Sequence, residues 1–265
     1  MAAVFMNTVD IIGDDALTDA IILRSIDEYI DNSIVNIGEH AFHECSKLTT
    51  VSCPIVTNIY DYAFAECSKL TTALFPLVQR ISDYAFASCT NLTTVLFPAV
   101  TYMEGSAFAN CAKLTDVSFP ILSMVPTSAF YGCSSLTSVF MPAVRSIGGS
   151  AFNGCSNLTT TSFPAALQIG SSAFAMCISL SVLSFPVVSL IYPSAFKSCS
   201  NLTALVLAGS SVCTLSNITA LSYTPIASKS GYIYVPTSLV TAYQQATNWS
   251  YYSTQISAVE DSEFI

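Results

Sequence analysis

The dipeptide Ala-Phe recurs eight times along this chain, and each copy follows the previous one after 22 residues. A cysteine, a leucine and a proline recur at the same interval, so that the unit reads P-x-V-x-x-I-x-x-x-A-F-x-x-C-x-x-L-T-x-V-x-F. Tandem copies without an insertion indicate a repeat architecture, which constrains the fold more strongly than local propensity does. The copies are Ala41-Phe42, Ala63-Phe64, Ala85-Phe86, Ala107-Phe108, Ala129-Phe130, Ala151-Phe152, Ala173-Phe174 and Ala195-Phe196.

A 22-residue unit falls within the range of leucine-rich repeats, in which each coil buries its apolar face only against its neighbours. Residues 92–98 favour a strand, because Val95 and Phe97 alternate with Thr94 and Leu96 before Pro98 ends the ladder. The Ala-Phe-x-x-Cys segment favours a short helical turn, which a preceding serine such as Ser106 would cap. The predicted fold class is an α/β repeat solenoid with one short parallel strand and one short helix per coil.

The two ends depart from the repeat, and a solenoid needs polar caps at its ends. We predict an N-terminal helical cap over 1–33, with its helix at 14–31, and a leucine-rich repeat solenoid over 34–207. Residues 208–265 form the predicted C-terminal cap, with a strand at 231–236 and a helix at 237–246.

Composition excludes several classes of protein. Hydrophobic residues make up 52% of the chain, yet no apolar run is long enough to span a bilayer, so we expect no membrane insertion. The net charge of −9 argues against nucleic acid as a partner. Residues 1–40 contribute −7 of that charge (eight acids, one base), whereas residues 41–202 balance six acids with six bases. An array without net charge suits short-range contacts with a protein or a glycan.

No motif in the chain supports catalysis or a cofactor. The eight in-register cysteines would point the same way in successive coils, so we interpret them as buried apolar residues without disulfides. They lack the paired spacing of a metal site, and His40 and His43 are interpreted as a solvated pair, so no metal is expected. We therefore predict no catalytic residue, and the chain is not expected to be an enzyme.

The unit I-G-x-x-A-F-x-x-C-x-x-L, present here at 147–158, resembles the BspA-type (Treponema pallidum-type) leucine-rich repeat. The resemblance covers residues 34–207. It implies a right-handed solenoid from bacteria, their phages or certain protists, and surface proteins used in adhesion or host recognition. The acidic N-terminus lacks the basic start and apolar core of a signal peptide, so we expect no ordinary secretory route. That expectation is consistent with a phage tail component and equally with a chain that was shortened at its N-terminus.

Two surfaces are candidates for binding. Side chains that flank the inward valine of each strand should line the concave face, where an apolar strip can mark an interface. A second group consists of the tyrosines on the other side that precede Ala-Phe: Tyr60, Tyr62, Tyr84 and Tyr102. The predicted binding residues on the concave face are Thr72, Leu74, Thr94, Leu96, Asp116, Ser138 and Phe140.

These observations predict a non-enzymatic recognition or adhesion module that binds a host protein or a glycan over one solenoid face. The alternative is a structural or receptor-binding component of a phage tail or bacterial surface assembly. The resemblance implies a cell-surface or extracellular location, and a phage particle is the other possibility. Oligomeric state does not follow from the sequence.

Overall fold

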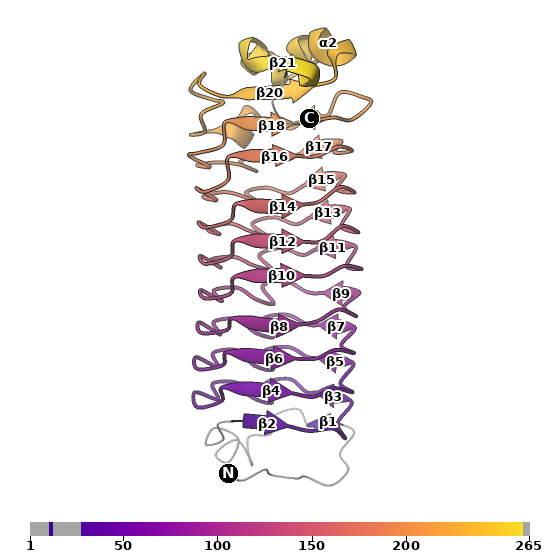
Figure 1. Cartoon of the computed structure of the whole chain (residues 1–265), viewed down its shortest axis with the longest axis vertical. Helices are drawn as coiled ribbons and strands as arrows, with labels where there is room; N and C mark the ends of the chain where they lie inside the picture. Colours follow the sequence, from indigo (N-terminus) through magenta and orange to yellow (C-terminus); the bar gives the residue numbers. More distant parts are fainter. Residues whose placement is uncertain (1–10, 13–27, 262–265) are drawn as a thin grey trace.

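The computed structural model describes residues 11–12 and 28–261, and it confirms a parallel solenoid. Each coil contributes two strands, which stack in two rows along the long axis (Figure 1). The long-strand row consists of β2 (Glu28–Ile30), β4 (Thr50–Ser52), β6 (Thr72–Leu74), β8 (Thr94–Leu96), β10 (Asp116–Ser118), β12 (Ser138–Phe140), β14 (Thr160–Ser162), β16 (Val182–Ser184), β18 (Ala204–Val206), β20 (Tyr232–Val235) and β21 (Ile256–Ala258).

The short-strand row holds two residues per coil, which are the repeating isoleucine position and the residue before it. Both rows pair in parallel in a register of one repeat, as in Thr72 with Thr94 and Arg80 with Tyr102. The short-strand row consists of β1 (Ile11–Ile12), β3 (Asn36–Ile37), β5 (Asn58–Ile59), β7 (Arg80–Ile81), β9 (Tyr102–Met103), β11 (Met124–Val125), β13 (Ser146–Ile147), β15 (Gln168–Ile169), β17 (Leu190–Ile191) and β19 (Thr214–Leu215).

The predicted helix in each coil is wrong, because the Ala-Phe-x-x-Cys segment forms tight turns, with residues of positive φ directly before the alanine and directly before the cysteine. Tyr62 has φ 54° and Glu66 has φ 61°, and a residue in this left-handed region interrupts a right-handed helix. The N–H of Phe64 donates to the oxygen of Ala85 in the next coil at 2.7 Å rather than back along its own coil. The predicted serine caps are wrong for the same reason, since Ser106 has φ 56° rather than the extended backbone of an N-cap.

The turns form a third ladder that links the coils where the strand rows are interrupted. Among the described residues, the long-strand row is divided into separate sheets between β8 and β10 and between β14 and β16, and the short-strand row between β9 and β11. Across the first of these joints the N–H of Phe86 donates to the oxygen of Ala107 at 2.8 Å. The array is therefore continuous in the turns even where strand pairing is absent.

Stacked rings occupy the centre of the array. The phenylalanine of each Ala-Phe copy is fully buried, and neighbouring rings in this column lie 4.9–5.9 Å apart. This spacing is close to the separation of about 4.8 Å between paired strands, so that backbone pairing and ring stacking reinforce each other. A second ring column, which includes Phe75, Phe97 and Phe119, packs at a tilt against the first.

The eight repeat cysteines form a column of buried thiols, and all ten cysteines of the chain are free. The Sγ of Cys67 donates to the backbone oxygen of Phe42 at 3.0 Å, and the same contact recurs in each following coil up to Cys199 and Phe174. That oxygen also accepts the N–H of Cys45 within its own coil. The cysteines therefore act as inter-coil donors as well as the apolar residues that the sequence predicts.

Side chains close the C-terminal end of the short-strand row. The C-terminal segment after β19 contains one α-helix, α2 (Val240–Gln245). It also contains four 3-10 helices, which are η2 (Ile218–Leu221), η3 (Thr237–Leu239), η4 (Trp249–Gln255) and η5 (Val259–Asp261). Trp249 Nε1 donates to the oxygen of Cys213 at 2.6 Å, and Asn248 Nδ2 donates to the oxygen of Leu215 at 2.7 Å. The N–H of Cys213 donates to the Tyr243 hydroxyl at 2.9 Å. These groups replace the backbone of a further coil at the open edge.

The predicted N-terminal helical cap lies only partly within the residues that the structure describes. Most of the helix predicted at 14–31 lies outside them, but Glu28–Ile30 form strand β2 rather than helix. These three residues therefore begin the long-strand row, because β2 pairs with β4 in the repeat register. The domain limits at 33/34 and 207/208 stay predictions. No helix of the described part has the length and apolar character needed to cross a membrane.

Candidate binding surfaces

The first candidate surface, here called the strand face, consists of the outward side chains at the first and third positions of the long strands. All seven predicted residues lie on it, and each is half-buried or exposed. Leu96 is 45% exposed and Phe140 is 52% exposed, whereas Leu74 is half-buried. At the end of the row, by contrast, Ala204 and Val206 are buried and contribute nothing to the surface.

Hydroxyl groups hold the rim of the strand face in register. Thr71, Thr93, Thr137, Thr159 and Thr203 each donate a side-chain hydrogen bond to the backbone oxygen of the residue one repeat earlier, at 3.0–3.3 Å. These threonines follow the repeating leucine, so the Leu-Thr pair combines a core residue with an inter-coil donor. The strand face is therefore supported by side chains as well as by strand pairing.

Asp116 is the single ionisable side chain on the strand face from β4 to β18. Its Oδ1 accepts hydrogen bonds from the hydroxyls of Ser138 and Thr137. The hydrogen bond from Ser138 is the main cause that holds the pKa of Asp116 below its ordinary value, despite partial burial. The carboxylate is thus ionised and partnered within the row, and the rest of the surface is uncharged.

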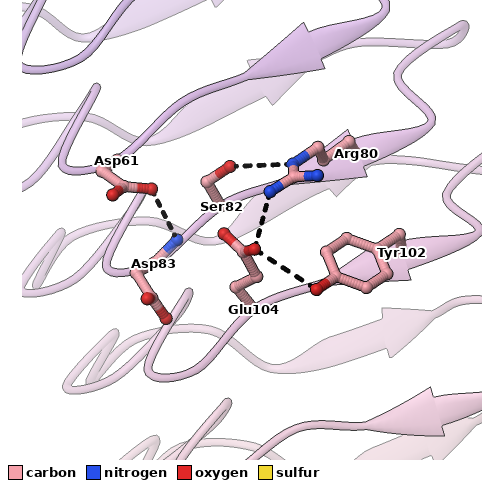
Figure 2. Close-up of polar contacts among 6 residues, drawn as sticks. All are labelled: Asp61, Arg80, Ser82, Asp83, Tyr102 and Glu104. Carbon is pink, nitrogen blue, oxygen red and sulfur yellow. Dashed lines mark hydrogen bonds and ion pairs between the residues drawn. The ribbon is translucent and has the colours of Figure 1, made fainter.

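The second candidate surface, here called the tyrosine–carboxylate cluster, lies on the short-strand row and the turns that follow it (Figure 2). Arg80 Nη2 donates to Glu104 Oε1 at 2.7 Å, and its guanidinium carbon lies 4.8 Å from the centre of the Tyr102 ring. The Tyr102 hydroxyl donates to the same Glu104 oxygen at 3.3 Å. Arg80 Nε donates to the buried Ser82 hydroxyl at 3.2 Å.

Two further carboxylates complete this cluster. The N–H of Asp83 donates to Asp61 Oδ1 at 3.2 Å, while the Asp83 carboxylate points away from Arg80 in Figure 2. Partial burial, followed by the charges of Glu104 and Asp61, raises the pKa of Asp83 above its ordinary value. The cluster therefore carries more negative charge than Arg80 neutralises.

The predicted tyrosine group divides between two environments. Tyr102 contacts both members of the Arg80–Glu104 ion pair, whereas Tyr62 and Tyr84 stack on each other at 4.9 Å and Tyr62 stacks on His40 at 5.0 Å. The interpretation of His40 and His43 as a solvated pair missed this stack, although both rings are partly exposed. The signal was an aromatic residue directly before Ala-Phe in three successive units.

Catalytic and metal chemistry find no positive support in these surfaces. In the described ranges, no three histidine, cysteine, aspartate or glutamate side chains are grouped so that they could hold a metal ion. Burial raises the pKa of Cys67, Cys177 and Cys199, to about 12 for Cys199, which is the opposite of an activated thiol. The two surfaces present exposed apolar side chains on one and aromatic rings with carboxylates on the other.

A family model described as the BspA type leucine rich repeat region, in six copies, matches residues 10–137 and 123–246. A solved leucine-rich repeat protein of T. pallidum is 27% identical, with a TM-score of 0.55 over 58% of this chain and 78% of that one. A leucine rich cell surface protein of Faecalibacterium prausnitzii is 21% identical, with a TM-score of 0.45 over 86% and 81%. No curated protein matches this chain.

Proposed function

The chain belongs to the family of BspA-type leucine-rich repeat proteins, and from this premise we propose that it is a non-enzymatic recognition module that binds a protein partner over the strand face. The observation that carries the proposal is the exposure of Leu96 and Phe140 on an otherwise hydroxyl-rich, nearly uncharged row. Exposed apolar groups rimmed by polar ones are typical of protein-binding surfaces. The module acts at a cell surface, as adhesion requires.

The repeat itself suggests that these apolar side chains are not required for folding. At the same strand position four other coils carry serine, as at Ser118 and Ser162, and those coils keep the same strand geometry. Leucine or phenylalanine at this position therefore adds exposed apolar surface to the array without being required for the strand to form. Full burial of an exposed side chain of this size contributes about 1.5–3 kcal/mol. Leu96 is 45% and Phe140 is 52% exposed, so a partner that covers them gains about 1 kcal/mol from each, and several together localise binding.

A glycan is the other ligand considered, and the strand face favours it less. An aliphatic side chain such as Leu96 offers a sugar neither a ring to stack on nor a hydrogen bond. Phe140 does offer a ring, but it lies two coils away from Leu96 and its neighbours Ser118 and Ser162 are small. Protein side chains fill such a discontinuous apolar strip more readily.

The test replaces Leu74, Leu96 and Phe140 by serine together and measures attachment of the labelled protein to a panel of mammalian and bacterial cells by flow cytometry. We expect attachment to fall at least tenfold, to be lost when the cells are first treated with protease, and to survive periodate oxidation of their glycans. The matched control is Ile178→Ser, because Ile178 is 45% exposed outside the strand face and serine occupies its position in most coils.

Unchanged attachment of the triple variant would refute the strand-face proposal, and loss on periodate treatment alone would replace the protein partner by a glycan. The second candidate function is a structural or receptor-binding part of a phage tail or surface assembly, attached through an end of the array. The concentration of acidic residues in 1–40 favours it, since the array itself is neutral. Loss of attachment when Asp14, Asp15 and Asp19 become asparagine, with the triple variant unaffected, would support that candidate instead.

A further inference from the structure

Three aromatic rings form a ladder along the outer turn of the first coils. His40, Tyr62 and Tyr84 follow each other at intervals of one repeat, with ring centres 5.0 and 4.9 Å apart and planes within 2° and 6° of parallel. All three residues share a positive φ of 54–56°, so their side chains leave the backbone in the same direction. The rings are therefore stacked face to face, with one ring for each coil.

The ladder stops at Tyr84 although the backbone continues. The N–H of Tyr84 donates to the oxygen of Gly105 at 3.1 Å, and Ser106 takes the next position with φ 56°. A serine side chain is too short to cover a phenol ring one coil away. Tyr62, with a ring on each face, is half-buried, whereas Tyr84 is 40% exposed. No ring in the described residues packs on the second face of Tyr84, where Ser106 occupies the space that a ring takes in the preceding coils.

The carboxylate of Asp83 lies beside this space. A Cβ added to Gly105 would be 3.2 Å from Asp83 Oδ1, which places the carboxylate over the backbone of the Ser106 coil. Glycine at position 105 leaves room for it there. Asp83 forms no ion pair within the described ranges, and its charge adds to those of Asp61 and Glu104. The space is thus bounded by an aromatic face and by a carboxylate that forms no ion pair in the described residues, although Arg80 and the backbone of Gly105 offset part of its charge.

The tyrosine–carboxylate cluster contains an example of a cation that is held by an aromatic face and a carboxylate. Arg80 lies over the Tyr102 ring at 4.8 Å and donates to Glu104 at 2.7 Å, which is a guanidinium held by one tyrosine face and one carboxylate. Tyr84 and Asp83 repeat these two groups in the neighbouring turn, without an ion-paired cation among the described residues. We propose that the open face of Tyr84 and the carboxylate of Asp83 bind the guanidinium of an arginine side chain on a partner protein.

Shape and charge select guanidinium over the alternatives. A guanidinium is planar and weakly hydrated, so it stacks on a phenol ring and still presents two N–H groups to one carboxylate. An ammonium is a compact and strongly hydrated charge that gains less from the flat face. A pyranose would stack on Tyr84 but would gain little from the accumulated negative charge. The site lies outside the strand face, so it stands independently of the proposed function.

The test is an NMR titration of the whole protein with ¹³C-labelled tyrosine rings against N-acetyl-arginine amide. We expect saturable shifts of the Tyr84 ring in the millimolar range. N-acetyl-citrulline amide, which has the same shape without the charge, should bind at least fivefold more weakly. Asp83→Asn should remove that preference, and Tyr84→Ser should abolish the response. Serine is the residue of the next five coils at this position, so the fold should be preserved.

The controls separate the site from the surrounding surface and from other ligands. Tyr131→Ala removes another exposed tyrosine, at a position where alanine is common in the array, and should leave the titration unchanged. Equal binding of arginine and citrulline amides would overturn the proposal. So would saturable Tyr84 shifts with methyl β-glucopyranoside and none with the arginine amide, because the site would then be a sugar platform. Attachment of Tyr84→Ser protein to cells reports separately on the strand face.

Discussion

Phe108 is the residue at which the continuity of the core is best measured. It is fully buried, it stacks on Phe86 at 5.2 Å and on Phe130 at 5.5 Å, and two tilted rings of the second column complete its surroundings. Replacement of a buried phenylalanine by alanine costs about 3–5 kcal/mol. Aromatic pairs contribute about 0.5–1.5 kcal/mol each beyond their burial, so four lost pairs place Phe108→Ala at the upper end of that range, at about 5 kcal/mol.

The consequence is more specific than a loss of stability. Coils of a solenoid contact only their neighbours, so a weak joint in the middle uncouples the two halves. Trp249, the single tryptophan, lies in the C-terminal segment, whereas far-UV circular dichroism reports on the whole array. We expect urea unfolding of the unmodified protein to give coincident midpoints for the two probes. In Phe108→Ala the dichroism should fall first, because the shorter N-terminal part loses its support while Trp249 stays packed.

The matched control is Phe140→Ser, which removes a phenylalanine of the same array from the strand face rather than from the core. Its side chain is 52% exposed, and its position is serine in neighbouring coils, so we expect a change below about 0.5 kcal/mol. A loss below about 1.5 kcal/mol for Phe108→Ala, with coincident midpoints, would refute the description of the ring column as one continuous core.

Three further results are expected. Because all ten cysteines are buried, and burial raises the pKa of Cys199 to about 12, a thiol reagent at neutral pH should modify none of them in the native protein and all of them in urea; rapid native labelling would contradict the burial. Trp249→Phe leaves the Cys213 oxygen without its donor and should cost about 1–3 kcal/mol in thermal unfolding, with Tyr251→Phe as an exposed control. Burial raises the pKa of Tyr243 and of Tyr252 to about 12, so stability from their neutral form is complete below pH 10 and should fall between pH 10 and 12; a flat denaturation profile across that window would contradict this.

The sequence was sufficient to predict which residues form the core, because each core position recurs in eight copies of the repeat and the 22-residue period aligns these copies. It was also sufficient to predict that Thr72, Leu96 and Phe140 share one outward surface, since alternation along a strand fixes the side of each residue. Binding at that surface stays a prediction. The short-strand row was missed because two residues are too few for alternation to show.

The predicted helix failed because the spacing of Ala-Phe-x-x-Cys fits a turn of helix as well as it fits a tight turn. The signal that separates them lies at the residue before each cysteine, where Gly132 and Gly154 adopt φ of 71° and 79°. Glycine twice and Asn110 once at that position indicate left-handed backbone, which ends a helix. The contact of Arg80 with Glu104 was hidden because it joins residues 24 apart, which become neighbours only in the solenoid register.

The side chains that close the short-strand row have a consequence for how this protein acquires its size. Every coil presents the next one with the same open edge, so nothing inside the array determines how many coils there are. The number is set where Tyr243, Asn248 and Trp249 meet that edge. A gene that gained or lost one 22-residue unit would encode a longer or shorter protein with both ends intact. The length of the solenoid, and with it the number of surface positions that can vary, can therefore change by one coil at a time without a new fold.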